Sequence, residues 1–221
     1  MMPKKLYVCL FLLGGILILT SCSAKSDLAL LGNLDCPQPC WNSILPGETL
    51  DDDAISILEK DRKIDQNSIK RGKATHHMYP DYISWNFDGS GHGIISLRDD
   101  KVKSIGLANV RFSVEDLIDL FGSPGEVTFL PYNGREWRAY ILYPKKGVWF
   151  SYVKKEDENK TIDILPEDVV TEIVFVIPNE FTATLEFMGS SFLKNQQLPL
   201  QEILQPWMGY GKTNVIWGNE N

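Results

Sequence analysis

The sequence predicts an α+β fold in which two helix-plus-antiparallel-meander units follow an apolar N-terminal leader. Two series of segments share one order, a helix-like segment and then alternating strand-like runs separated by turns. Val102 and Ile105 of the first series recur as Val170 and Ile173 in the second, which indicates an internal duplication. The chain has 221 residues, 43% of them hydrophobic and 23% charged, which is the composition of a globular protein with one or two cores.

The leader has the layout of an export signal. Lys4 and Lys5 precede an apolar run at residues 6–18, which is too short for a comfortable spanning helix. The segment Leu19-Thr20-Ser21-Cys22 then resembles the bacterial lipobox. This resemblance implies that residues 1–21 are a cleaved lipoprotein signal peptide and that Cys22, carrying acyl chains such as palmitate, becomes the N-terminus. An uncleaved signal anchor is the alternative.

A lipid-modified Cys22 would make this an exported protein held at the bacterial membrane, in the periplasm or on the outer face of the cell membrane. Two or three acyl chains give stable anchoring, whereas one chain gives marginal binding. We predict that residues 22–35 form a tether. The net charge is −7 and becomes more negative when Lys4 and Lys5 are removed, so the body gains no attraction to anionic lipid headgroups.

Two cysteines remain in the predicted mature domain, Cys36 and Cys40. An even pair in an oxidising compartment predicts a disulfide. A redox motif would have two residues between its cysteines, and this pair has Pro-Gln-Pro. A zinc site would need further ligands, and His76 and His77 lie at no ligand spacing from the pair. We therefore expect no metal.

The first unit is predicted to span residues 36–110. Its helix, at residues 50–60, has Thr49 as N-cap and acidic residues in the first turn. Its helical spacing predicts a buried face made of Leu50, Ala54, Ile57 and Leu58. Three strands are predicted from alternation and from turns at Asp88-Gly89-Ser90-Gly91 and Asp99-Asp100, at residues 81–87, 92–98 and 101–107.

The second unit is predicted to span residues 111–180. Ser113 caps a helix that ends at Phe121, before Gly122. The strands that follow are predicted at residues 126–131, 135–143, 148–153 and 169–177, with the hairpin signal Asn133-Gly134 between the first two. The sequence leaves open whether the two units share a core.

The remaining residues, 181–221, are predicted to form an aromatic-rich extension. A short helix is expected at residues 199–205, followed by an ordered loop at residues 207–211. This loop is expected either to pack back over the sheet or to form a partner surface.

Short motifs in both units resemble known families. The helix start Pro46-Gly-Glu-Thr49, the segment Leu120-Phe-Gly-Ser-Pro124 and the meander are similar to the small lipoprotein of the outer-membrane barrel-assembly machinery and to the tandem-domain β-lactamase inhibitor proteins. The resemblance covers most of residues 41–178. It implies this architecture and a role in binding other proteins without catalysis. It carries over no binding residue position by position.

Signals for catalysis or nucleic-acid binding are weak. The acidic charge opposes contact with phosphates, so we expect no nucleic-acid partner. Ser90 lies in a turn without the spacing of a nucleophile elbow, and His92 has no partner at motif spacing. We predict no cofactor and no enzyme activity. A cell-envelope hydrolase with a carboxylate pair, or a small-ligand sensor with a deep apolar pocket, are the alternatives.

Aromatic residues mark the predicted binding surface. Aromatic side chains and arginine are enriched where proteins bind one another. We expect the working surface to be the sheet face opposite the helices, or the C-terminal loop, and a protein partner to bind there. The candidate residues are Trp41, Tyr82, Arg138, Tyr140, Trp207 and Tyr210.

Overall fold

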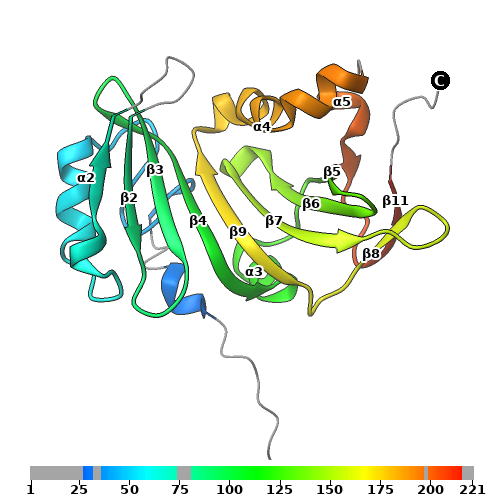
Figure 1. Cartoon of the computed structure of the whole chain (residues 1–221), viewed down its shortest axis with the longest axis horizontal. Coiled ribbons are helices and arrows are strands. Elements are labelled where there is room, and N and C mark those ends of the chain that lie inside the picture. Colours follow the sequence, from blue (N-terminus) through cyan, green and yellow to red (C-terminus); the bar gives the residue numbers. More distant parts are fainter. Residues whose placement is uncertain (1–26, 32–35, 74–80, 197–198, 216–221) are drawn as a thin grey trace, which may run out of the picture.

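A computed structural model describes residues 27–31, 36–73, 81–196 and 199–215 (Figure 1). The predicted signal peptide, Cys22, and the pair His76 and His77 lie outside the described residues. The described part contains helices and a large antiparallel sheet, which confirms the α+β class.

The strands of both predicted units form one nine-stranded sheet within the described residues. Its order is β1-β2-β3-β4-β9-β7-β6-β5-β10, and every neighbouring pair is antiparallel. The units meet where β4 pairs with β9, a junction that we call the seam. The strand bounds are β1 Lys70–Gly72, β2 Tyr82–Asn86, β3 His92–Arg98, β4 Lys101–Ser113, β5 Glu126–Asn133, β6 Glu136–Tyr143, β7 Val148–Lys155, β9 Val169–Val176 and β10 Gln205–Pro206.

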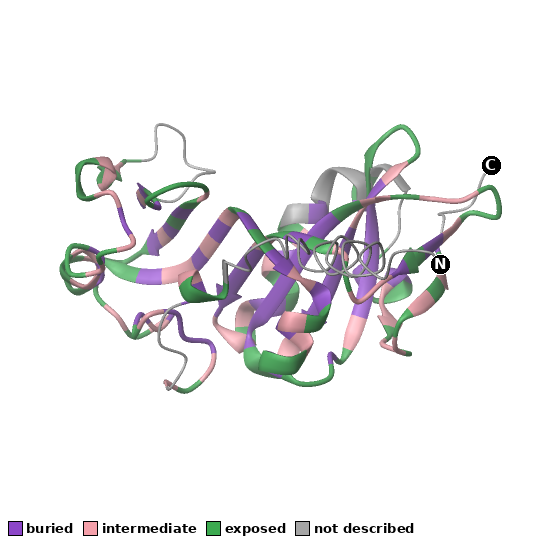
Figure 2. Ribbon diagram, turned by 90° about the horizontal axis from the view of Figure 1, so that it is seen from below, coloured by how far each residue is buried: buried purple, intermediate pink, exposed green. Residues whose placement is uncertain are grey.

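A separate two-stranded ribbon joins β8 (Thr161–Ile164) to β11 (Gly211–Asn214). Strands β1, β8, β10 and β11 were not predicted from the sequence, and Gln205 of β10 was predicted to end a helix. The predicted strands lie where they were expected, although β4 is longer than predicted. In Figure 2, buried and less buried positions alternate along many of the strands, as expected for a sheet with two different faces.

Helices cover the two sheet faces unequally. Helices α2 (Asp51–Leu58) and α3 (Val114–Phe121) pack on one face, the inner face, over a continuous core. Helices α4 (Phe181–Gln196) and α5 (Leu200–Ile203) pack on the opposite, outer face, against β5, β6, β7 and β9. The remaining turns of helix are η1 (Asp27–Leu31), η2 (Gln66–Ser68), η3 (Pro144–Lys146) and η4 (Pro178–Glu180).

The start of α3 is as predicted, and the start of α2 is not. The Ser113 hydroxyl accepts a hydrogen bond from the backbone N–H of Asp116, and the Asp116 carboxylate accepts one from the backbone N–H of Ser113. These two bonds form a capping box at the N-terminus of α3. Leu50 is the N-cap of α2, while the Thr49 hydroxyl accepts a hydrogen bond from the N–H of Leu45 at 2.9 Å. Leu50 is 47% exposed, so its prediction as a core residue was wrong.

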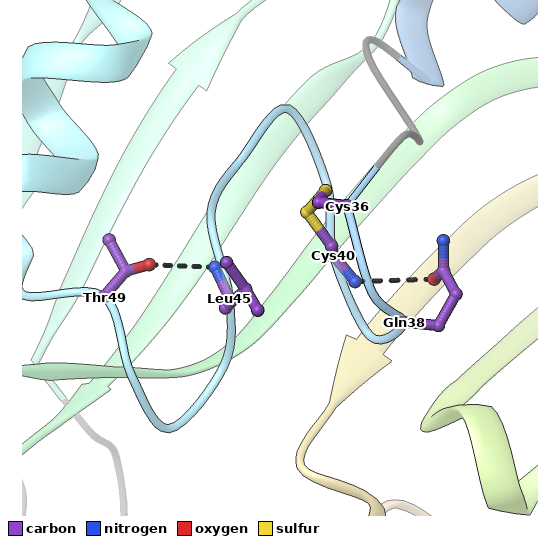
Figure 3. Close-up of a disulfide and its surroundings, with 5 residues drawn as sticks. All are labelled: Cys36, Gln38, Cys40, Leu45 and Thr49. Carbon is purple, nitrogen blue, oxygen red and sulfur yellow. Dashed lines mark hydrogen bonds between the residues drawn. A yellow bond between two sulfur atoms is a disulfide. The ribbon is translucent and has the colours of Figure 1, made fainter.

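The disulfide between Cys36 and Cys40 closes a small loop beneath the seam (Figure 3). Cys40 is fully buried, and its N–H donates to the side-chain oxygen of Gln38 at 3.4 Å. Pro39 lies close to Gly147, where an added Cβ would be 3.1 Å from the proline ring and 2.1 Å from the carbonyl oxygen of Val176. The loop therefore lies beside Gly147, the residue before β7, and Gly147 itself lies against the end of β9.

The folded body begins within the predicted tether. Leu31, in η1, is 1% exposed, and the carbonyl of Leu30 accepts a hydrogen bond of 3.0 Å from the Trp41 indole N–H. Lys63 donates to the carbonyl of Ala29. Leu31 is thus part of the inner-face core and Leu30 packs against it, while Leu28 is exposed. Cys22 lies five positions before Asp27 in the sequence.

The C-terminal extension wraps around the β5 edge of the sheet. The carbonyl of Ile203, in α5 on the outer face, accepts a hydrogen bond of 2.9 Å from the hydroxyl of Thr128. Strand β10 then pairs with β5, and Trp207 packs against the inner-face core. Finally, β11 pairs with β8. The short helix predicted near residue 200 is confirmed as α5, whereas the longer α4 was not predicted.

Within the residues that the structure describes, no helix combines the length and the apolar character that crossing a bilayer requires.

The tight contact between Trp85 and Gly93 gives a stability prediction. A Cβ at position 93 would lie 1.9 Å from the Trp85 ring, which itself stacks on Trp41 at 5.3 Å between ring centroids. Overpacking of this kind costs about 1–3 kcal/mol. We expect Gly93→Ala to lower the free energy of unfolding by about that amount in denaturant titrations.

Gly125→Ala is the matched control, because its added Cβ would make only an ordinary contact of 3.6 Å with Pro144. If the two variants have the same free energy of unfolding, the packing of the Trp85 ring does not require a glycine at position 93.

Candidate interaction surface

None of the helices that the structure describes packs on the outer face of β2, β3 and β4. Figure 1 shows α4 and α5 near the ends of β9, β7, β6 and β5, whereas no helix crosses in front of β2, β3 and β4. Strand register arranges the outward residues of these strands in rows. We call this surface the open face, and its residues are Tyr82, Ser84, Asn86, His92, Ile94, Ser96, Ser104, Gly106 and Ala108.

The central rows of the open face, which the residues above make up, carry no acidic residue, lysine or arginine. Charged residues of the same face lie at its margins, where Arg98 pairs with Lys101 and Lys70 pairs with Ser84. The floor of the open face is made of small side chains, above which Ile94, 42% exposed, and Tyr82, 36% exposed, stand out. The Tyr82 ring lies against Gly72 of the edge strand, since a Cβ there would be 2.2 Å from the ring. Depletion of charge at the centre, with aromatic and apolar residues present, is the composition of a protein interface.

Two ion pairs lie at the border of the open face. Arg98 forms an ion pair with Glu180 at the start of α4. Arg138 forms an ion pair with Glu172 at 3.0 Å, and Glu172 also accepts a hydrogen bond of 2.7 Å from Ser151. The predicted residues Tyr82 and Arg138 thus lie on one sheet face, but Arg138 is in the neighbouring half.

Two predicted surface residues are buried, and their prediction was wrong. Trp41 is fully buried between Trp85, Phe87 and η1. Tyr140 faces outward as its alternation predicted, but it is only 5% exposed because it belongs to the core beneath α4 and α5. Burial raises the pKa of Tyr140 to about 12. Neither side chain is available to a partner.

The remaining two candidates lie away from the open face. Trp207 and Tyr210 make an edge-to-face contact at 5.9 Å between centroids, and Trp207 is half-buried against the inner-face core. Tyr210 is 43% exposed, and partial burial with the nearby carboxylates of Glu115 and Asp119 raises its pKa. The sheet face and the C-terminal loop, which the sequence offered as alternative working surfaces, are therefore separate places on the molecule.

His92, the histidine considered for catalysis, is the first residue of β3 and is exposed on the outer face. His92 Nδ1 lies 3.4 Å from the side-chain amide nitrogen of Asn109. No group of three or more His, Cys, Asp or Glu residues within the described ranges could hold a metal. Burial raises the pKa of Tyr143 and Tyr152, both of which are core side chains. The central rows of the open face form a contact area without charged side chains.

Asp157 fixes the C-terminal ribbon to the loop before β8. Its carboxylate accepts hydrogen bonds from Lys212 at 2.9 Å, from the N–H of Thr161 at 3.0 Å and from the hydroxyl of Thr161 at 2.8 Å. These interactions hold the pKa of Asp157 well below its ordinary value of 3.8. The hydrogen bond with Lys212 has the largest effect, and the bonds from Thr161 follow. The charged form is therefore favoured by the folded ribbon.

This lowered pKa predicts how the ribbon depends on pH. A carboxylate whose pKa falls on folding stabilises the structure above its unfolded pKa, and this contribution is lost as the pH drops through the folded pKa. We expect Asp157→Asn to speed hydrogen exchange of the β11 amides at pH 6. The difference from wild type should shrink as the pH falls below about 4.

Glu158→Gln serves as the control for this ribbon, because Glu158 is exposed beside Asp157. If both substitutions loosen β11 equally, the carboxylate of Asp157 has no special part in holding the strand.

Comparison with known proteins does not assign this chain to a family. No protein-family model, no curated protein and no solved structure matches the chain. The case for its function therefore depends on its own residues.

Proposed function

We propose that this chain is a lipid-anchored, exported protein that binds another protein through its open face. The observation that carries the proposal is the absence of charge from the central rows of an exposed sheet surface, in a chain that is 23% charged and has basic residues at the margins of that surface. Charge depletion distinguishes the centres of interfaces from ordinary surface. Ile94 and Tyr82 would supply the apolar contacts, and the serine hydroxyls would supply adaptable hydrogen bonds.

The proposed anchor is Cys22, within the lipobox-like segment. The disulfide between Cys36 and Cys40 supports an oxidising compartment, because such bonds persist in exported proteins. Asp27 is the first described residue and lies five positions after Cys22, a stretch that spans at most about 17 Å when fully extended. We infer that the protein works close to the membrane surface.

An internal duplication would explain the architecture. Val102 and Ile105 lie in β4, and their counterparts Val170 and Ile173 lie in β9, its partner at the seam. Each strand ends a series that begins with a helix on the inner face. This arrangement supports two related units, and it agrees with the resemblance to tandem-domain inhibitor proteins that bind other proteins.

Lipid attachment has a direct test. Intact-mass analysis of the chain from envelope fractions should show a species that begins at Cys22 with acyl chains, and Cys22→Ala should abolish that species. The resemblance to the lipobox predicts that this variant keeps its uncleaved leader. Recovery of an unmodified wild-type chain would contradict the anchor and leave the binding proposal standing.

The binding surface is tested with a photo-crosslinking residue placed at Ser84 or Ser96. We expect one discrete adduct in the native envelope, and Ile94→Asp should abolish it, because burying a charge without a partner is unfavourable. The matched control is Leu120→Asp. Leu120 is 45% exposed, close to the 42% of Ile94, but it lies on α3 on the inner-face side.

Adducts that survive Ile94→Asp, or that appear equally from a probe at Lys60 on the helix side, would show that the open face is not the interface.

A further inference from the structure

A hollow of about 270 Å³ lies at one end of β4, outside the surface proposed above. It is bounded by the turn between β3 and β4, by the first residues of β4, and by Gly47 and Ile177. Three cationic side chains line it, Arg98, Lys101 and Lys103, together with one carboxylate, Asp99. The lining thus has an excess of positive charge, whereas the whole chain has an excess of negative charge, with 22 basic and 29 acidic residues.

A β-bulge in β4 brings these cations together. Val102 pairs with Leu97 and Ser104 pairs with Ser96, so Lys103 is an extra residue without a cross-strand partner. The bulge keeps both Val102 and Ile105 in the inner-face core, although they are three positions apart. Lys101 lies directly opposite Arg98. Bulges commonly redirect side chains next to functional sites.

The positive charges of this hollow are only partly offset. Arg98 forms an ion pair with Glu180, which also raises the pKa of the guanidinium. The ammonium groups of Lys101 and Lys103 form no ion pair or hydrogen bond in the described part of the chain, and they share one nearby carboxylate, Asp99. Like charges held close together repel, and a bound anion would remove that cost.

A larger hollow on the other side of Arg98 differs in this respect. It has a volume of about 400 Å³ and is lined by four aspartates and three cations. Arg71 there is paired with Asp51 and Asp52. Its charges largely offset one another, so it shows no preference for ligand charge.

We propose that the smaller hollow is an oxyanion-binding site, in which Lys101 and Lys103 hold a phosphate or carboxylate group and Arg98 provides a third donor. Ammonium groups bind phosphate as mobile point charges, while a guanidinium offers a planar pair of donors. The apolar wall at Val102 and Ile177 would contact the uncharged part of a small ligand that bears the anionic group. The site does not depend on a protein covering the open face.

The test is a titration of the ¹⁵N-labelled full chain in detergent, with phosphate in one arm and acetate in the other. Sodium chloride keeps the ionic strength constant, since salt screens exposed charges. We expect saturable shifts confined to the amides of Gly47, Lys101 and Lys103. Stronger binding of phosphate would assign a phosphate-bearing ligand, and equal binding would extend the site to carboxylates.

Variants of equal charge separate a site from a general effect of net charge. Lys101→Gln with Lys103→Gln should weaken anion binding about tenfold or more. Lys60→Gln with Lys155→Gln removes the same charge from two exposed lysines elsewhere and should leave binding unchanged. The proposal is overturned if neither anion shifts these amides, if the first pair binds like wild type, or if both pairs weaken binding equally.

Discussion

Pairing between β4 and β9 is the constraint on which the rest of the molecule depends. These strands are distant in sequence, and their register sets Ile105 opposite Phe175 and Leu107 opposite Ile173. That register merges two sets of strands into one sheet, so α2 and α3 share one inner-face core. The segment before α2 reinforces the junction, because the N–H of Gly47 donates to the carbonyl of Val102 and Pro39 packs near Gly147.

Local patterns in the sequence predicted most of the sheet and both inner-face helices. Alternation identified the faces of β2 correctly, and Ser113 with Gly122 bounded α3. The misses have physical causes. Helix α4 has a glycine, Gly189, in its buried stripe where Leu130 packs closely, so its apolar periodicity is weak. Strand β1 is three polar or glycine residues that depend on β2 for their conformation.

The candidate site was only partly predictable, because exposure depends on what packs above a strand. Alternation placed Tyr82 and Tyr140 on the outer face, and both lie there. Tyr140 is buried because α4 and α5 pack over it. The residue pattern of β6 alone does not predict that helices pack on this part of the sheet. Trp41 lies in an irregular segment, and its burial depends on stacking against Trp85, which is far away in the chain. The bulge at Lys103 also becomes visible only in the pairing of β3 with β4.

The wrapping of the C-terminal extension has a consequence for how this sheet meets other chains. A bare edge strand is a template for unwanted pairing and aggregation. At the β5 edge, β10 pairs with the strand and Pro131 removes a donor. At the other edge, β1 is short and basic, and beyond it the N–H of Asn86 donates to the hydroxyl of Ser68 at 2.8 Å. Both margins of the described sheet thus resist strand addition, so copies of the chain are hindered from joining edge to edge into a continuous sheet.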